Sequence, residues 1–145
     1  MSRLTTVRQA PKRGLYLSLT PHHATPRALF DQLNAEFQFN FDPCPLGDTS
    51  IWDGRLASWQ GMRVFCNPPY GRTVGTWLAK AREAEVAVYL LPSRTDTAWW
   101  HDYALAADEI RFIRGRLQFG DGSKGRGAPF PSVILVYRRA KWAPR

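Results

Sequence analysis

The sequence contains few of the residues that build disulfide frameworks and metal sites. Its 145 residues include two cysteines and three histidines. Cys44 and Cys66 are too few for a disulfide framework or a zinc cluster, and the histidines have no regular spacing. We therefore expect reduced thiols, which pack as small buried side chains, and no structural metal.

Long apolar segments are also missing. No uninterrupted apolar run reaches the roughly 20 residues that a membrane-spanning helix needs, and no apolar block follows the basic N-terminus as in a secretory signal. We therefore expect a cytoplasmic protein without membrane contact. The length, with 44% hydrophobic residues, suits one domain with a buried core.

Acidic residues are scarce at both ends of the chain. Residues 1–14 contain four basic and no acidic side chains, and residues 111–145 contain nine basic side chains and only Asp121. Residues 15–110 are slightly acidic, with seven basic and eleven acidic side chains. A polyanion is a natural partner for such ends, because phosphate contacts supply sequence-independent affinity. A solvated, solubilising surface explains the charge equally well.

Hydrophobic periodicity predicts alternating helices and strands. Residues 1–14 have no periodicity and are interpreted as a flexible basic arm, followed by a single domain over residues 15–145. The first expected helix has Thr25 as N-cap and Pro26 as its first residue. Helices are expected over residues 25–36, 74–85 and 96–107. Strands are expected over residues 37–41, 63–66, 86–91, 110–119 and 132–137.

This order of elements indicates an α/β fold. Alternating strands and helices predict a mostly parallel sheet with helices covering it. The last two strands flank a Gly-rich loop over residues 120–127, and we expect them to form an antiparallel edge at the C-terminus. Ligands of open α/β sheets bind beyond the carboxyl ends of the strands. Three polar segments follow expected strands and should therefore share a site: Asp42-Pro43-Cys44, Asn67-Pro68-Pro69-Tyr70 and Pro92-Ser93-Arg94-Thr95-Asp96.

The segment from Asn67 to Tyr70 fits one chemical task closely. An exocyclic amino group on a purine is a poor nucleophile, because its lone pair is delocalised into the ring. The Asn67 carbonyl and a backbone carbonyl of the prolines can accept both N–H bonds and free that lone pair. Pro68 and Pro69 add no competing N–H group, and Tyr70 would stack on the base. The alternative is a strand-ending turn without chemistry.

Several further motifs follow the same order as in one known family. They are Thr25-Pro26-Arg27-Ala28-Leu29-Phe30-Asp31, Asp42-Pro43-Cys44, Asp53-Gly54, Trp59, Asn67-Pro68-Pro69-Tyr70-Gly71, Leu91-Pro92-Ser93-Arg94-Thr95-Asp96-Thr97, Trp100-His101-Asp102, Arg114-Gly115-Arg116-Leu117, Phe119-Gly120 and Ala128-Pro129-Phe130-Pro131-Ser132. Over approximately residues 24–137 the sequence resembles the phage-type DNA N6-adenine methyltransferase (Dam-like) family. Several separate motifs in register make coincidence an unsatisfactory explanation.

The resemblance implies a site-specific, adenine-specific DNA methyltransferase. Its expected fold is a compact, truncated Rossmann-like fold that uses S-adenosylmethionine. Its expected reaction transfers a methyl group to adenine N6 in double-stranded DNA after the base is flipped out of the stack, without a metal. It also implies the bacterial cytoplasm as location, with a phage or prophage as a conceivable origin. The DNA recognition sequence and the oligomeric state stay open.

The resemblance also implies which residues bind the cofactor. It assigns Thr25 and Pro26 to the methionine portion, and Asp42-Pro43-Cys44 with Gly47 to an acidic loop that usually contains more glycines. Only 16 residues separate Gly47 from Val64, so the sheet must be truncated there. The acidic residue that normally binds the ribose then has no ordinary strand, and Asp53 is our substitute. A turn aspartate before Gly54 is the alternative for Asp53, and a plain helix cap for Thr25.

Residues on the DNA side are expected after the third and fourth strands. They are Arg94, Thr95, Trp100, His101, Arg114, Arg116, Lys124 and Arg126. Structural roles compete for some of them. Thr95 or Asp96 can cap the helix over residues 96–107, and Trp99 or Trp100 can pack in the core.

Two rival functions remain open. The same tetrapeptide serves planar amino groups in RNA or in a protein glutamine, so methylation of those groups is one rival. The short cofactor half of the chain suggests the other, a DNA-binding remnant with weak or lost cofactor binding. The basic ends and the flanking motifs favour DNA adenine methylation.

Overall fold

The central element of the fold is a four-stranded sheet with the strand order β1-β2-β4-β3. The computed structural model describes residues 25–45, 49–119 and 127–139, so the basic arm, Gly47, Lys124 and Arg126 lie outside the described residues. The strands are β1 (Arg63–Cys66), β2 (Val86–Pro92), β3 (Glu109–Phe112) and β4 (Ser132–Arg138). Expected strands 63–66, 86–91 and 132–137 are therefore confirmed, whereas β3 is much shorter than the expected 110–119.

The sheet is not mostly parallel, which corrects the expected strand arrangement. β1 and β2 are parallel, with Val64 opposite Ala87, but β2 pairs antiparallel with β4 and β4 antiparallel with β3. The reason is the connection after β3, which returns to β4 without a crossover helix in its described residues. The antiparallel pairing of the last two strands is confirmed, although β3, and not β4, forms the edge.

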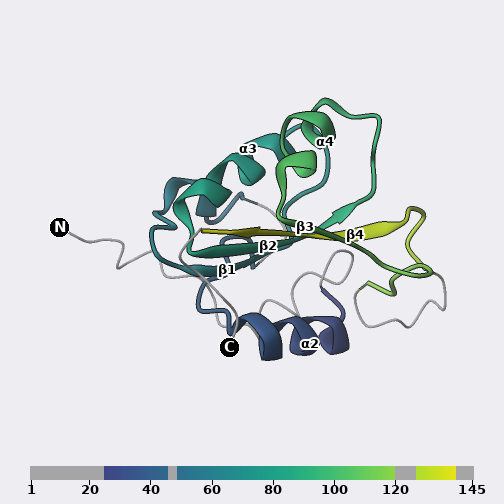
Figure 1. Ribbon diagram of the computed structural model, residues 1–145, viewed down its shortest axis with the longest axis horizontal. Helices are drawn as coiled ribbons and strands as arrows, with labels where there is room; N and C mark the ends of the chain where they lie inside the picture. The colour runs from purple at the N-terminus through teal and green to yellow at the C-terminus, as the bar shows by residue number, and fades with distance from the viewer. Residues whose placement is uncertain (1–24, 46–48, 120–126, 140–145) are drawn as a thin grey trace.

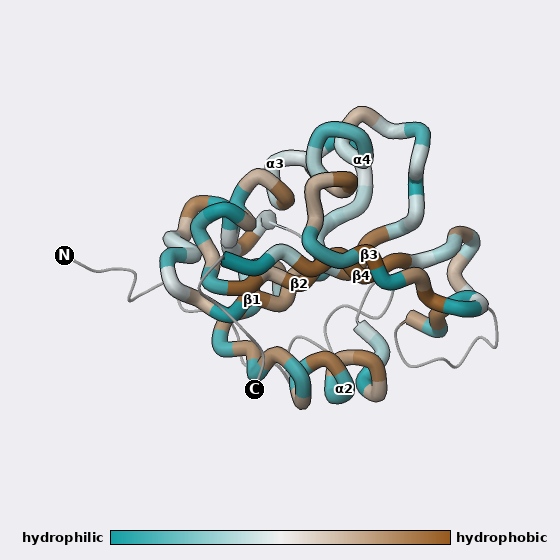
Figure 2. Tube along the Cα trace, viewed as in Figure 1, coloured by the Kyte–Doolittle hydropathy of each residue, from teal (hydrophilic) through white to brown (hydrophobic). Residues whose placement is uncertain are grey.

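Helices cover both faces of the sheet. Helix α2 (Arg27–Phe37) lies on one face, and α3 (Val74–Ala79) and α4 (Ala98–Asp102) lie on the other (Figure 1). Every residue of β2 is buried. Its alternate side chains Val86, Val88 and Leu90 pack with α2, whereas Ala87, Tyr89 and Leu91 pack with α3 and α4. The apolar strands between two helical layers are visible in Figure 2. This double burial is what the continuous apolar run predicts.

The expected strand over residues 37–41 is wrong. Phe37 is the last residue of α2, and Gln38 follows with a φ of 53°. The backbone of this segment pairs with the sheet only at its end, where Phe41 forms an isolated parallel bridge to Val64 and the N–H groups of Asn40 and Phe41 donate to the Arg63 carbonyl. Phe37 and Phe39 alternate because they pack into one aromatic group with Phe30 and Phe65. The period of two therefore reflects core packing around a tight turn and not a ladder of hydrogen bonds.

Helix boundaries also differ in detail. Helix α2 begins at Arg27 after Pro26, so Thr25 is not its N-cap and Pro26 is not its first helical residue. The expected helix 74–85 consists of α3 and a 3-10 helix, Lys80–Glu83. The expected helix 96–107 contains α4 and a 3-10 helix, Ala104–Ala106. Neither Thr95 nor Asp96 caps α4, because the Thr97 hydroxyl accepts from the Trp100 N–H.

The segment between Phe41 and β1 contains little regular secondary structure. Between Phe41 and β1, the described residues contain no helix except the 3-10 helix Gly54–Leu56. The loop at Pro43 packs directly against Gly54, where an added Cβ would lie 1.9 Å from the Pro43 oxygen. No helix in the described part of the chain combines the length and hydropathy needed to cross a membrane.

Candidate active site

Asn67 is held at the carboxyl end of β1 by hydrogen bonds on both ends of its amide. Its Nδ2 donates to the Thr25 hydroxyl at 3.1 Å, and its Oδ1 accepts from the Tyr70 hydroxyl at 2.9 Å. The side chain is 1% exposed. These two contacts fix the plane of the amide. The Asn67 amide is therefore pre-oriented at the end of β1.

Tyr70 is fixed through its hydroxyl group as well as through its ring. Beside the bond to Asn67, the hydroxyl contacts the Leu90 carbonyl of β2 at 3.4 Å. The ring lies against Phe130 and Phe119, with ring centroids 5.6 and 6.5 Å away. Tyr70 therefore links the end of β1 to the last residues of β2 and to the segments that flank residues 120–126.

Thr25 reaches this site from the segment just before α2. It is buried although it lies just before α2, and its hydroxyl accepts from Asn67. Pro26 follows as the residue before the helix. The structure thus brings Thr25 to Asn67 and rules out the helix-capping alternative, whereas its assignment to the methionine portion of the cofactor stays a prediction.

The acidic loop after Phe41 lies beside β1. The pairing of Phe41 with Val64 brings Asp42 to the end of that strand. The Asp42 carboxylate accepts from the Cys44 N–H at 3.0 Å, and this bond closes a tight turn. Cys44 and Cys66 are both buried and free, in agreement with the expectation of reduced thiols. Burial raises the pKa of the Cys66 thiol, and the proximity of Cys44 and Asp42 raises it further.

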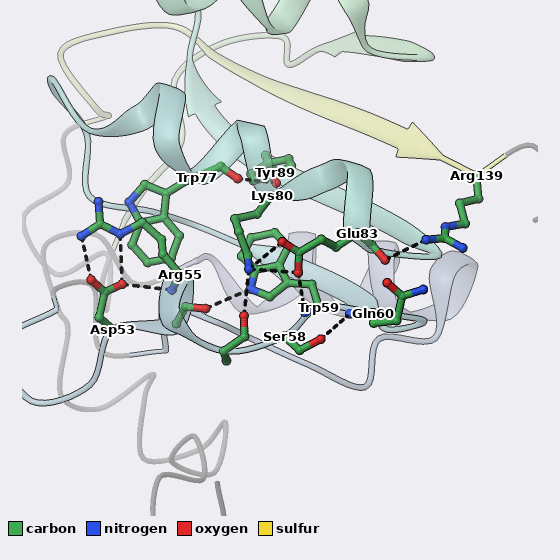
Figure 3. Close-up of polar contacts among 12 residues, drawn as sticks. Asp53, Arg55, Ser58, Trp59, Gln60, Trp77, Lys80, Glu83, Tyr89 and Arg139 are labelled. Atoms are coloured by element: carbon green, nitrogen blue, oxygen red, sulfur yellow. Dashed lines mark hydrogen bonds and ion pairs between the residues drawn. The ribbon is translucent and has the colours of Figure 1, made fainter. Parts of the chain in front are cut away.

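Asp53, the candidate ribose ligand, is engaged by Arg55. The guanidinium binds both carboxylate oxygens, at 3.0 and 2.8 Å (Figure 3). This hydrogen bonding lowers the pKa of Asp53. Arg55 also donates to the Thr76 hydroxyl and lies over the Trp77 ring at 4.9 Å. Sequence reasoning missed Arg55, although its position two residues after an aspartate in an Asp-Gly turn was a usable signal.

A second hydrogen-bond network fixes the short loop over residues 53–59, which precedes β1. The Trp59 indole donates to the Gly54 carbonyl at 2.9 Å, and its backbone N–H donates to Glu83. Lys80 binds Glu83 and the Ala57 carbonyl. Figure 3 shows these groups between the loop and the helical segment after α3. Trp59, completely buried, thereby anchors the loop that carries Asp53.

The segment after β2 contains both surface and core residues. Arg94 and Thr95 are exposed, as is His101, whose Nε2 lies 2.8 Å from the Thr95 carbonyl. Trp100 is 4% exposed and packs in the core, which is the structural role considered for one tryptophan of the pair. Trp99 is partly buried against the same core. Of the residues expected on the DNA side in this segment, Trp100 is buried, whereas Arg94, Thr95 and His101 are exposed.

Arg114 and Arg116 are exposed and follow β3. The Arg116 guanidinium also donates to the Ala128 carbonyl at 3.3 Å, so it links the two sides of the connection between β3 and β4. Phe119 and Phe130 are the residues of this connection that sequence reasoning left without a role. The aromatic residues on either side of the Gly-rich loop were the available signal.

Comparison with protein families gives a match over most of the chain. The model of the family described as DNA N-6-adenine-methyltransferase (Dam) matches residues 18–144. No curated protein and no solved structure gives a match. The matched range includes all of the described residues, from Thr25 to Arg139, and so contains the tetrapeptide, the acidic loop and the connection after β3. The chain belongs to the DNA N-6-adenine-methyltransferase (Dam) family.

Proposed function

We propose that the protein transfers a methyl group from S-adenosylmethionine to the N6 amino group of an adenine in DNA. Membership of the Dam family supports DNA adenine methylation in general. The observation that carries the specific mechanism is the fixed amide of Asn67, bonded to Thr25 and Tyr70 at the end of β1. A pre-oriented carbonyl is the group that this reaction requires.

Asn67 and the backbone carbonyl of Pro68 accept the two N–H bonds of the target amine. This would favour a pyramidal nitrogen, whose freed lone pair could accept the methyl group that the cofactor supplies. The methylated amine would then lose one proton to solvent. Because Asn67 and Pro68 act most strongly on the pyramidal nitrogen, they lower the barrier and not only the energy of binding.

The residues present suit the proposed cofactor by their chemistry. S-adenosylmethionine supplies, when bound, an electrophilic methyl group on a positively charged sulfur. Asp42 offers a carboxylate beside the end of β1, and Thr25 offers a buried hydroxyl next to Asn67. Pro26, Pro43 and Cys44 would form the walls. Asp53 would meet the ribose only by sharing its carboxylate with Arg55.

Double-stranded DNA is the proposed substrate, and the target base has to leave the helix to reach Asn67. Arg94, Thr95, His101, Arg114 and Arg116 are exposed on the segments after β2 and β3. Their positive members would contact phosphates, and Lys124 and Arg126 are proposed to join them. The charge of residues 111–145, with nine basic side chains, supports this surface.

The test is a transfer assay with radiolabelled S-adenosylmethionine on unmethylated plasmid DNA, total RNA and a protein extract. We expect label in DNA only, released as N6-methyladenine on digestion to nucleosides. Label in RNA or protein with none in DNA would favour the rival substrates. Titration of the cofactor by calorimetry separates the remaining rival, because a DNA-binding remnant would bind DNA without a binding heat for the cofactor.

A further inference from the structure

Two aromatic residues from the connection between β3 and β4 lie against Tyr70. The Phe130 ring is nearly perpendicular to the Tyr70 ring, at 83° and 5.6 Å, and the Phe119 ring lies at 75° and 6.5 Å. Phe119 and Phe130 also contact each other at 6.1 Å. Rings in perpendicular contact restrict each other's rotation. The orientation of Tyr70 therefore depends on side chains about 50 and 60 residues further along the sequence.

Hydrogen bonds hold this aromatic group in place. Ala128 N–H donates to the Leu117 carbonyl at 2.8 Å, which joins the two sides of the connection. The Ser93 N–H donates to the Pro131 carbonyl at 2.9 Å and so ties the end of β2 to the residue after Phe130. The guanidinium of Arg94 lies over the Phe130 ring, 5.6 Å from its centre. Phe130 thus contacts both an exposed cation and Tyr70.

Ser132 adds a polar group at the same end of the sheet. It is 1% exposed, and its hydroxyl has no hydrogen-bond partner among the described residues. Alternation along β4 places Ser132 on the α2 face with Ile134, and alternation along β1 places Asn67 on that face with Phe65. A buried hydroxyl without a partner destabilises the fold. Its presence is explained if a ligand supplies the missing partner.

We propose that Phe119 and Phe130, on the two described sides of the connection between β3 and β4, help to form the pocket for the target base as positioning residues for the Tyr70 ring, and that Ser132 at the start of β4 donates a hydrogen bond to the base. The ring nitrogens of adenine are acceptors, so the Ser132 hydroxyl has a suitable atom to bond. Arg94, packed on Phe130, lies where the phosphate of the extruded nucleotide would be neutralised. This inference rests on the proposed function and assigns residues to its substrate.

Ser132→Ala gives the sharper test, because the change leaves no cavity larger than an oxygen atom. We expect kcat on plasmid DNA to fall about fivefold, the size of one lost hydrogen bond, while the midpoint of urea unfolding stays the same or rises. Cofactor affinity by calorimetry and DNA affinity should not change. A purely structural serine would show the opposite pattern, with lower stability and unchanged kcat.

Phe130→Leu tests the ring and Phe130→Tyr its rescue. We expect about a tenfold loss of kcat for leucine and near-complete recovery for tyrosine, since an aromatic contact has this order of energy. Phe112→Ala is the matched control, because Phe112 is 71% exposed on β3 and takes no part in the site. The fluorescence of 2-aminopurine at the mapped target position of a duplex should increase when the wild-type protein binds. The increase should be smaller with Phe130→Leu.

The outcomes separate the inference from the function on which it rests. If the wild-type protein methylates DNA while Ser132→Ala and Phe130→Leu both match Phe112→Ala within twofold, the inference is overturned and the proposed function stands. If the wild-type protein transfers no methyl group to DNA, the proposed function fails and the inference falls with it. Should Phe130→Leu not fold, Ser132→Ala alone decides.

Discussion

At the scale of single residues, Asn67 and Tyr70 form a coupled pair. The Tyr70 hydroxyl donates to the Asn67 carbonyl oxygen at 2.9 Å, and the proposed mechanism places a substrate N–H on the same oxygen. The ring and the hydroxyl of Tyr70 therefore have separable roles. In the proposed function the ring would stack on a base, whereas the hydroxyl bonds the Asn67 amide.

Two substitutions of Tyr70 separate these roles. We expect Tyr70→Ala to lower kcat/KM for DNA by about tenfold or more, because stacking on a base has an energy of roughly 1–3 kcal/mol. Tyr70→Phe retains the ring and should stay within a few-fold of wild type. The measurement is steady-state methyl transfer with DNA affinity determined in parallel. Equal losses for both variants would show that the hydroxyl, and not the ring, is the essential group.

Residue chemistry was the part that sequence could predict best. The position of Asn67 after a buried strand, and the presence of two cysteines as buried free thiols, follow from local sequence. The contacts of Thr25 and Arg55 do not, because Thr25 bonds a residue 42 positions away and Arg55 bonds Thr76. Partners separated by such distances depend on the tertiary fold, which no local pattern encodes.

At the scale of elements, the contact between the loop at Pro43 and Gly54 determines how the short segment between Phe41 and β1 is built. The Pro43 carbonyl lies so close to Gly54 that a Cβ would be 1.9 Å from its oxygen. The Pro43 oxygen belongs to the backbone, and the backbone also fixes the position of a Cβ at residue 54. No rotation of a side chain can therefore relieve the contact. This close approach lets one loop take the place of a longer strand and helix between the acidic loop and β1.

Gly54→Ala should therefore destabilise the protein strongly, by more than about 2 kcal/mol, through overpacking at a backbone contact. Gly61→Ala is the matched control. Its φ of 70° makes alanine unfavourable by about 1 kcal/mol, but nothing lies within 4 Å of the added atom. Urea unfolding of both variants measures the difference. Equal destabilisation would contradict the close packing of the two loops.

The type of an element was predicted correctly where a whole run of residues is buried. The prediction was wrong where only single residues of a segment are buried. The apolar run of β2 is buried on both faces and was assigned correctly. The alternating phenylalanines from Phe37 to Phe41 suggested a strand, but Phe37 ends α2 and Gln38 adopts a positive φ. The position of β4 between β2 and β3 was not predicted, because strand order is set by which edge of β2 remains available for pairing.

At the scale of the whole molecule, basic charge is concentrated away from the acidic middle of the chain. Residues 111–145 carry nine basic side chains and one acidic one. Arg114 and Arg116 are exposed on the described part of this region, and Arg94 is exposed beside Phe130. Contacts of this kind hold DNA by releasing counterions, so they determine affinity and not the chemical step.

Arg116→Ala should weaken DNA binding in a salt-dependent manner. We expect the slope of log affinity against log salt concentration to fall by about 1, the contribution of one phosphate contact. Arg27→Ala serves as control, because Arg27 is exposed on α2 and was assigned no DNA contact. Fluorescence anisotropy with a labelled duplex at several salt concentrations gives the slope. An unchanged slope would remove Arg116 from the DNA surface.

The central claim is that the Asn67 carbonyl activates adenine N6. The most direct measurement is mass spectrometry of nucleosides from unmethylated plasmid DNA incubated with S-adenosylmethionine and either wild-type or Asn67→Ala protein. The account predicts N6-methyladenine from wild type and at least about 100-fold less from Asn67→Ala, with DNA and cofactor affinities retained. Normal N6-methyladenine formation by folded Asn67→Ala protein would contradict it.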